Sequence, residues 1–213
     1  MVHPFYGLGN LAQFIRGGNG DARKWPIICK ISIGIARGIH HLHTAFEKPI
    51  IHGNLKSKNI LLDHHYQPYV SDFGLHLLLN PTTGQQMLEV SALQGYKPPE
   101  LIKMKDACEE NDIYSLGVIF LELITGKEPV HGNTNSDKEF YLPSATRSAI
   151  LDDRVTDLYH RDILLGLSDD QRVVTEEGIL KYFRLAMACC SPSRLLRPDT
   201  RQILDKLEEI GDQ

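Results

Sequence analysis

The sequence predicts a mainly α-helical protein with small pairs of β-strands, and three patterns support this. Apolar residues recur at steps of three and four from Trp25 to His43, which indicates an amphipathic helix. The segment from Asn111 to Ile124 is apolar nearly all round, as is typical of a fully buried helix. Short β-type runs lie between residues 50 and 72. We therefore expect helices to dominate, with small strands around a functional loop.

The predicted helices have recognisable ends or faces. Pro26 is tolerated in the first turn of the first long helix. Gly126 stands at the usual position just after a helix, and Pro129 follows it, so the buried helix should end there. The segment Ile179–Cys190 is amphipathic, and Asp199–Ile210 carries its apolar residues on one side. We expect a helix over each of these two segments.

The remaining segments are predicted to be strands or loops. The runs "PII", "NILLD" and "PYVSD", at residues 49–51, 59–63 and 68–72, are expected to form short strands. Residues 73–100 are polar and show no clear period, so we expect a long loop that is functional or mobile. Residues 131–148 are also polar and irregular, and we expect an exposed loop there.

Composition excludes several classes of protein. The 213-residue chain has a net charge of −4, so it offers no basic surface for nucleic acid or for an anionic membrane. The first ten residues lack the charged leader and apolar core of a signal peptide. The longest apolar segment, "IYSLGVIFLELI", is too short to span a bilayer and contains Glu122. We expect no membrane contact by this chain itself.

The cysteines do not form a metal-binding pattern. No C-x-x-C pair is followed by a second pair, so a zinc site is not expected. Free buried thiols in a reducing compartment are the better interpretation. The residues concerned are Cys29, Cys108, Cys189 and Cys190.

A series of short motifs follows in order along the chain. His52–Asn59, "HGNLKSKN", has the spacing of the protein-kinase catalytic loop H-R-D-L-x-x-x-N. Asp72-Phe73-Gly74 matches D-F-G, and Pro98-Pro99-Glu100 stands where A-P-E closes the activation segment. "DIYSLGVIFLELITG" from Asp112 and "RPD" from Arg197 complete the set. A single D-F-G is weak evidence, whereas five ordered motifs at this spacing are strong evidence.

The first long helix narrows the resemblance. "KWPIICKISIGIARGIHHLH" closely resembles the W-x-x-x-x-K-I-x-x-G-x-A-R-G pattern of plant receptor-like kinases, and "GLGNLAQFI" resembles the hinge and following helix of their leucine-rich-repeat members. "HGNLKSKNILLD" is similar to the loop of their inactive branch, which includes transmembrane-kinase-like proteins. The resemblance implies one kinase-like domain fragment over residues 1–213. Residues 1–20 would be the hinge and first short helix, and residues 21–210 the large helical lobe.

The smaller, β-rich lobe of the family is expected to be absent from this chain. No strand lysine of the V-A-I-K type is present, since the first lysine is Lys24 on the large-lobe side. "GLGNLA" fits the dinucleotide pattern G-x-G-x-x-[GA], but only six residues precede Gly7, so there is no room for the required strand. We interpret these glycines as hinge and turn residues.

Three positions depart from the family pattern in ways that imply lost chemistry. Asn54 stands where the resemblance implies a catalytic aspartate, and its amide cannot accept a proton near pH 7. Gly53 replaces the neighbouring arginine, which in the family reads an activation-segment phosphate. Leu93 replaces the threonine that would bridge the catalytic aspartate and lysine. We therefore expect no competent catalytic residue.

Other positions keep the family residue. By resemblance Lys56 could still contact a phosphate oxygen, or it could be a solvated loop lysine. Asn59 and Asp72 keep the oxygens that would hold magnesium, or they could be structural remnants. Leu61 would be the floor beneath adenine in a whole kinase. We expect no cofactor, with Mg²⁺ and ATP bound only if the missing lobe is present.

The scaffold positions resemble the family more closely than the chemical ones. Glu100 and Arg197 are expected to form the buried ion pair that fastens the activation segment. Asp112 should accept main-chain hydrogen bonds from the loop around His52. His52 and Phe73 resemble the lower half of the hydrophobic regulatory spine. We also expect an apolar patch around Leu61, Phe73 and the segment before Leu11.

The leading hypothesis is a receptor-like pseudokinase domain that acts as a signalling scaffold or partner-binding module. Its partners would be proteins, another receptor-like kinase among them. The resemblance implies a cytoplasmic location, at the cytosolic face of the plasma membrane if the chain is part of a longer receptor. The alternative is a fragment of a longer ATP-binding serine/threonine receptor-like kinase whose missing lobe supplies nucleotide binding. A third possibility is a degenerate gene copy without a stable product.

Overall fold

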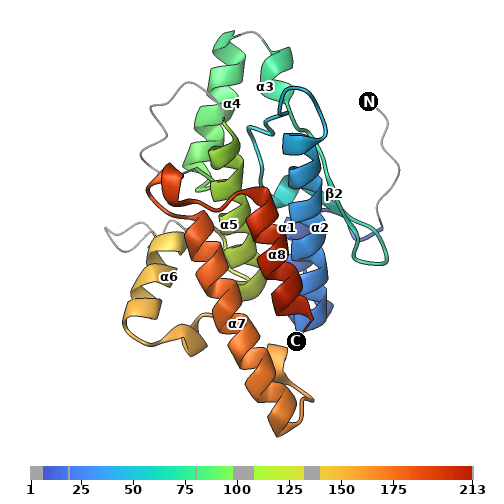
Figure 1. Cartoon of the computed structure of the whole chain (residues 1–213), viewed down its shortest axis with the longest axis vertical. Coiled ribbons are helices and arrows are strands. Elements are labelled where there is room, and N and C mark those ends of the chain that lie inside the picture. The colour runs from blue at the N-terminus through green and yellow to red at the C-terminus, as the bar shows by residue number, and fades with distance from the viewer. Residues whose placement is uncertain (1–6, 19, 80, 98–107, 132–139, 213) are drawn as a thin grey trace.

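The computed structural model describes residues 7–18, 20–79, 81–97, 108–131 and 140–212. Most of this part of the chain is helical (Figure 1). The α-helices are α1 Leu11–Arg16, α2 Trp25–Thr44, α3 Leu75–Leu78, α4 Pro81–Leu93, α5 Glu109–Thr125, α6 Leu142–Leu151, α7 Asp169–Cys189 and α8 Thr200–Gly211. Short 3-10 helices are η1 Gly20–Arg23, η2 Ser57–Asn59, η4 Val155–Asp157, η5 Arg161–Leu164 and η6 Arg194–Leu196.

Helix α5 forms the centre of the core, as its sequence predicts. Every residue from Asn111 to Ile124 is buried. Helices α2 and α7 pack against α5, and α8 lies across α2 (Figure 1). The α5–α7 contact is close at Gly117, where a Cβ atom would lie 2.7 Å from the Cβ of Cys189. A side chain at position 117 would therefore push the two central helices apart.

A small antiparallel sheet lies against α2. β1 Ile60–Leu62 pairs with β2 Pro68–Val70, with Leu61 opposite Tyr69. Two of the three predicted strands are thus confirmed. The prediction of a strand over residues 49–51 is wrong, because the Ile50 N–H donates to the Leu42 carbonyl at the end of α2 and not to a strand. A second pair joins β3 Val130–His131 to β4 Phe140–Tyr141.

The long helices are predicted well where one face is buried. α2 and α5 lie within two residues of their expected limits, and α5 ends at Gly126 with a left-handed φ of 71°. Helix α7 begins ten residues before its predicted start, after a capping box in which Ser168 and Gln171 bond each other's main-chain N–H groups. Its first turns expose apolar residues such as Val173, so the expected apolar stripe is missing there.

Two predictions of irregular structure are wrong. Within residues 73–100, the structure contains α3 and α4, the latter starting at Pro81, a residue suited to a first helical turn. Helix α4 has no strong apolar face, so periodicity could not reveal it. Within residues 131–148, Phe140 and Tyr141 form β4 and residues from Leu142 belong to α6, which buries Leu142 and Thr146. Residues 132–139 lie outside the described part of the chain.

The cysteines are free, as expected. Cys29, Cys189 and Cys190 are buried and Cys108 is half-buried. Within the described residues, no helix is both long enough and apolar enough to cross a membrane. The same part of the chain contains no group of three or more histidine, cysteine, aspartate or glutamate side chains suited to a metal ion.

A buried carboxylate joins three separate segments to the core. The Glu122 side chain on α5 is fully buried and accepts from Arg16 Nη1 at 3.0 Å. It also accepts from the Ser57 hydroxyl at 3.1 Å and from the Tyr96 hydroxyl at 2.6 Å. Burial raises the pKa of Glu122, while the hydrogen bonds from Tyr96 and Arg16 oppose that rise. We call Arg16, Ser57, Tyr96 and Glu122 the Glu122 cluster.

A buried lysine follows Tyr96 directly. The Lys97 side chain is only 7% exposed, and it lies near the carboxylate of Asp112. Burial lowers the pKa of Lys97 to about 8, although the negative charge of Asp112 opposes that shift. The neutral amine of Lys97 is therefore more favourable in the folded state than in the unfolded, solvated chain.

Replacing Arg16 with Met should destabilise the protein by about 3 kcal/mol, because the buried Glu122 carboxylate would lose its cation. Urea unfolding at pH 7 measures this change. The control is Arg23→Met, which breaks the exposed Arg23–Asp162 pair and should cost less than about 1 kcal/mol. Equal losses in the two variants would show that the Glu122 cluster does not need Arg16.

The free energy of unfolding should rise between pH 8 and about 10.5 because of Lys97. The pKa of Lys97 is lowered in the folded state, so the unfolded state binds more protons in this window and stability increases with pH. The variant Lys97→Met should lack this rise, which amounts to about 3 kcal/mol. Unfolding of both proteins across the window tests this, with Lys48→Met, at an exposed site, as the control. A constant difference between wild type and Lys97→Met would contradict the prediction.

Candidate functional site

The loop from His52 to Asn59 is anchored to the start of α5 by one carboxylate. Asp112 accepts hydrogen bonds from the main-chain N–H groups of His52 at 2.7 Å and Gly53 at 3.0 Å. The ring nitrogen Nε2 of His43 lies 3.0 Å from the same carboxylate. The hydrogen bonds expected of Asp112 are therefore present, and they fix the path of the loop's backbone.

Gly53 makes this path easy to adopt. Its φ of 76° lies in the left-handed region, where a residue without Cβ avoids a steric cost. The turn presents two consecutive N–H groups to Asp112. The glycine at this position therefore suits the backbone geometry, although it removes the cationic side chain expected from the family pattern.

Asn54 stands where the motif resemblance implies a catalytic aspartate. The residue is 8% exposed, and its main-chain carbonyl accepts from Nδ2 of Asn59 at 3.0 Å. Its side-chain Oδ1 is buried and has no hydrogen-bond partner within the described residues. A neutral amide in this position can align a hydroxyl but cannot take its proton.

Lys56 is engaged by the activation segment. Its Nζ donates to Oε1 of Gln94 at 3.2 Å. Burial lowers the pKa of Lys56, the nearby charge of Lys58 adds to that shift, and Asp72 opposes it. Sequence reasoning did not identify Gln94, because this residue lies outside the motifs quoted above. Leu93, beside it, is 76% exposed and does not replace the expected bridging contact.

The Asp72-Phe73-Gly74 motif lies beside the loop. The Ser71 N–H donates to the Asn59 carbonyl at 2.9 Å, and the Gly74 N–H donates to the His52 carbonyl at 3.2 Å. Asp72 has a left-handed φ of 59°, and its exposed carboxylate accepts from the Ser71 hydroxyl at 3.3 Å. The motif and the loop are therefore tied together by main-chain hydrogen bonds.

The two residues that resemble the lower half of the regulatory spine, His52 and Phe73, differ in how deeply they are buried. His52 is fully buried, whereas Phe73 is 44% exposed. Leu61 is half-buried, because it lies in β1 opposite Tyr69 and also bridges to Asn10. Leu61 is therefore not the centre of an exposed surface.

Exposed apolar side chains occur instead on α3 and α4 and at Phe73 and Leu79, which lie outside the two helices. We call this surface the α3–α4 patch and define it by Phe73, Leu77, Leu78, Leu79, Val90 and Leu93, which are all exposed. The two helices contact each other and extend from the body of the molecule (Figure 1). The predicted segment before Leu11 lies partly outside the described residues.

The donors for magnesium form an incomplete set. Asn59 and Asp72 could each offer one side-chain oxygen, and Mg²⁺ requires close to six oxygens in an octahedron. Asn59 already uses its amide nitrogen to close the loop on Asn54. The remaining ligands would have to come from phosphates and water, so these residues fit a metal only together with a nucleotide.

Arg197 belongs to the scaffold of the site. Its Nε donates to the Ser191 carbonyl at 2.9 Å, and its Nη1 donates to the Glu110 carbonyl at 2.9 Å. The guanidinium also stacks 4.9 Å from the centre of the Tyr114 ring. Its expected ion-pair partner Glu100 lies outside the described residues, so that pair remains a prediction.

Comparisons with known proteins agree with the geometry. A family model described as "Protein kinase domain" matches residues 1–204. The putative kinase-like protein TMKL1 of Arabidopsis thaliana is 35% identical over 88% of this chain and 27% of that protein. The probable leucine-rich repeat receptor-like protein kinase IMK3 of the same plant is 34% identical over 99% of this chain and 26% of that protein. The chain thus spans about a quarter of the length of these curated relatives.

A solved structure shares the fold. The pseudokinase domain of BIR2, described as an immune regulator of the RLK/Pelle family, aligns with a TM-score of 0.79 at 28% identity. The alignment covers 98% of this chain and 59% of that one. The ordered motifs, the matched family model and this shared fold identify the chain as a member of the protein kinase family, corresponding to its large helical lobe and related to the plant leucine-rich-repeat receptor-like kinases.

Proposed function

We propose that this chain is a catalytically impaired kinase-like domain that acts by binding protein partners. The observation that carries the proposal is Asn54, a buried neutral amide at the position of the proton acceptor. Loss of general-base help costs about 10²–10⁴-fold in rate, or roughly 3–5 kcal/mol of activation free energy. This loss alone would leave a very slow enzyme.

The Lys56–Gln94 contact supports the proposal independently. Phosphoryl transfer depends on cations placed around the transferred group. Lys56 is the loop cation nearest in sequence to Asn54, and its ammonium donates to Gln94 at 3.2 Å. Binding a phosphate there would require that contact to open.

The α3–α4 patch supports a role in binding. Apolar surfaces of this kind mark interaction sites in folded proteins or invite aggregation. The family resemblance suggests another receptor-like kinase as a partner and the cytosolic face of the plasma membrane as the location. Of the two relatives, TMKL1 is called kinase-like and IMK3 a probable protein kinase.

The alternative function is that of a fragment of a longer, ATP-binding serine/threonine kinase. The observation that favours it is the retention of Asn59 and Asp72, side chains suited to Mg²⁺ and phosphate. Sequencing the transcript upstream of Met1 discriminates between the two. A strand lysine and a glycine-rich loop there, together with Mg²⁺-dependent ATP binding by the longer product, would favour the alternative.

The purified chain should not phosphorylate itself or a generic protein substrate in the presence of Mg²⁺ and ATP. Incorporation of labelled phosphate measures this directly. The control is Asp72→Ala, since removal of an exposed carboxylate should not unfold the protein. A signal in wild type that disappears in Asp72→Ala would refute the proposed function.

Restoring the acidic residue alone should not restore activity. We expect Asn54→Asp to remain inactive in the same assay, because Gly53, Leu93 and the engaged Lys56 still differ from the catalytic arrangement. The double variant Asn54→Asp/Gln94→Ala separates the two obstacles. If Asn54→Asp alone transfers phosphate, the base position is the sole defect and the argument from Lys56 is wrong.

A further inference from the structure

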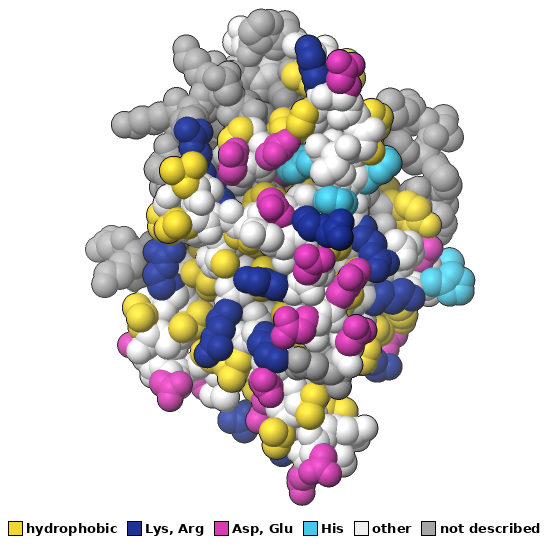
Figure 2. Space-filling model, viewed as in Figure 1, with side chains coloured by type: hydrophobic (Ala, Val, Ile, Leu, Met, Phe, Trp, Pro, Cys, Tyr) yellow, Lys and Arg dark blue, Asp and Glu magenta, His cyan; other side chains and the backbone are white. Residues whose placement is uncertain are grey.

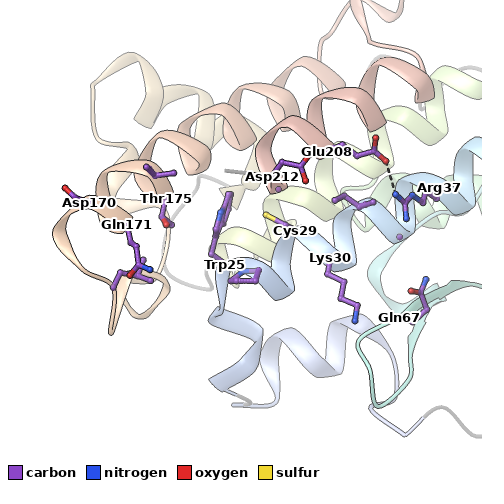
Figure 3. Close-up of a pocket in the computed structure, with 16 residues that line it drawn as sticks. Trp25, Cys29, Lys30, Arg37, Gln67, Asp170, Gln171, Thr175, Glu208 and Asp212 are labelled. Carbon is purple, nitrogen blue, oxygen red and sulfur yellow. Dashed lines mark hydrogen bonds and ion pairs between the residues drawn. The ribbon is translucent and has the colours of Figure 1, made fainter.

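A broad groove lies on the molecule away from the catalytic-loop region. It has a volume of about 830 Å³ and runs between the first half of α2, the start of α7 and the end of α8 (Figure 3). Trp25, Lys30, Gly34 and Arg37 of the first-helix pattern line it, whereas no described residue of the catalytic-loop or Asp72-Phe73-Gly74 motifs does. Its residues come from segments far apart in sequence, so only the folded protein forms it.

The floor of the groove is apolar and rigid. Trp25, Cys29 and Ile33 lie one helical turn apart on α2 and share this face. Trp25 packs edge-on against Tyr182 at 5.8 Å, and a Cβ atom on Gly178 of α7 would lie 3.0 Å from its ring. The indole is therefore held in place. Burial raises the pKa of the Cys29 thiol to about 12, so this side chain is a neutral part of the floor.

The rim of the groove carries unpaired negative charge. Asp170 on α7 and Asp212 at the end of α8 are exposed, and neither forms an ion pair with any described residue. Arg37 on the rim is already paired with Glu208 at 2.8 Å, which leaves Lys30 as the lining cation without a described ion pair. The carboxyl end of α8 adds the negative end of a helix dipole beside Asp212.

The hydroxyl of a largely buried threonine also faces this space. Thr175 lines the groove and is 9% exposed, and its side-chain hydroxyl forms no hydrogen bond with a described residue. Figure 3 shows it on the α7 wall, across the groove from α8. Such a hydroxyl can bond the main chain or a polar side chain of a bound molecule.

We propose that this groove binds a basic, amphipathic helical segment of a partner protein. Leucine-like side chains of the segment would cover Cys29 and Ile33. Lysine or arginine side chains would lie beside Trp25 and near Asp170 and Asp212, which Figure 3 shows on opposite sides of Trp25. A cation is attracted both by carboxylates and by the face of an indole ring. The same surface would repel an acidic segment. A purely apolar occupant would bury the two carboxylates without a cationic partner, which costs free energy because each charge loses its hydration.

Binding in this groove would provide the partner-binding role proposed above, and it does not involve the catalytic-loop region. Binding in the groove and the absence of phosphate transfer are measured separately. An active kinase could still use the groove, and an inactive domain could lack any groove partner.

Trp25 offers a direct signal for the test, because it is the only tryptophan in the 213 residues. The probe is a capped peptide of about 14 residues, a length at which isolated helices become marginally stable, built from leucine and lysine in a helical repeat. The matched peptide has glutamate in place of every lysine. We expect the lysine peptide to change Trp25 fluorescence in a saturable way, and the glutamate peptide to leave it unchanged.

Charge variants then localise the binding. The double variant Asp170→Asn/Asp212→Asn should weaken binding of the lysine peptide about tenfold or more. The control Asp152→Asn/Asp205→Asn removes the same charge at exposed positions outside the groove and should bind like wild type. Thermal unfolding checks that both variants remain folded. Equal binding of the two peptides, equal weakening by the two variants, or no saturable change with the lysine peptide would each overturn the proposal.

Discussion

The carboxylate of Asp112 holds the candidate site together, because it binds the main chain of a loop 60 residues earlier in the sequence. Hydrogen bonds to a charged acceptor contribute about 1.5–3 kcal/mol each, more than most neutral ones. Both N–H donors belong to the backbone of His52 and Gly53, so these hydrogen bonds use no side-chain atom of the loop. The shape of the loop can therefore persist while its chemistry changes.

This difference between main-chain and side-chain contacts explains why the domain keeps the shape of the loop but lacks its catalytic side chains. Main-chain contacts also join the Asp72 motif to the loop, through Ser71 and Gly74. By contrast, proton transfer and phosphate contact depend on individual side chains, and here Asn54 is neutral and Lys56 is engaged by Gln94. On the face drawn in Figure 2, acidic and basic side chains are interspersed over α7 and α8, so this face does not form a continuous basic surface.

The sequence predicts those helices and strands whose buried faces produce a regular spacing of apolar residues along the chain. Helices α2 and α5 and the β1–β2 pair are recognisable because one face or the whole element is buried. Helix α4 and the first half of α7 lie on the surface, where no apolar stripe marks them. The motif residues of the site could be located by spacing alone.

Contacts between distant, non-motif residues could not be predicted. Gln94 lies outside the quoted motifs, and only the folded chain brings it to Lys56. The groove at Trp25 likewise depends on how α7 and α8 meet α2, which no local pattern encodes. The pKa shift of Lys97 could not be predicted from the sequence either, because it follows from burial of the side chain in the folded state.

The Glu122 cluster has a consequence for motion. One carboxylate binds α1 through Arg16, the catalytic-type loop through Ser57 and the end of the activation segment through Tyr96. If any of these three segments moves away, the buried charge loses a donor that the other two cannot replace. The three segments should therefore open together as one cooperative unit rather than fray singly. A protein that binds the segment around Tyr96 would then alter the fluctuations of α1 without contacting α1 itself.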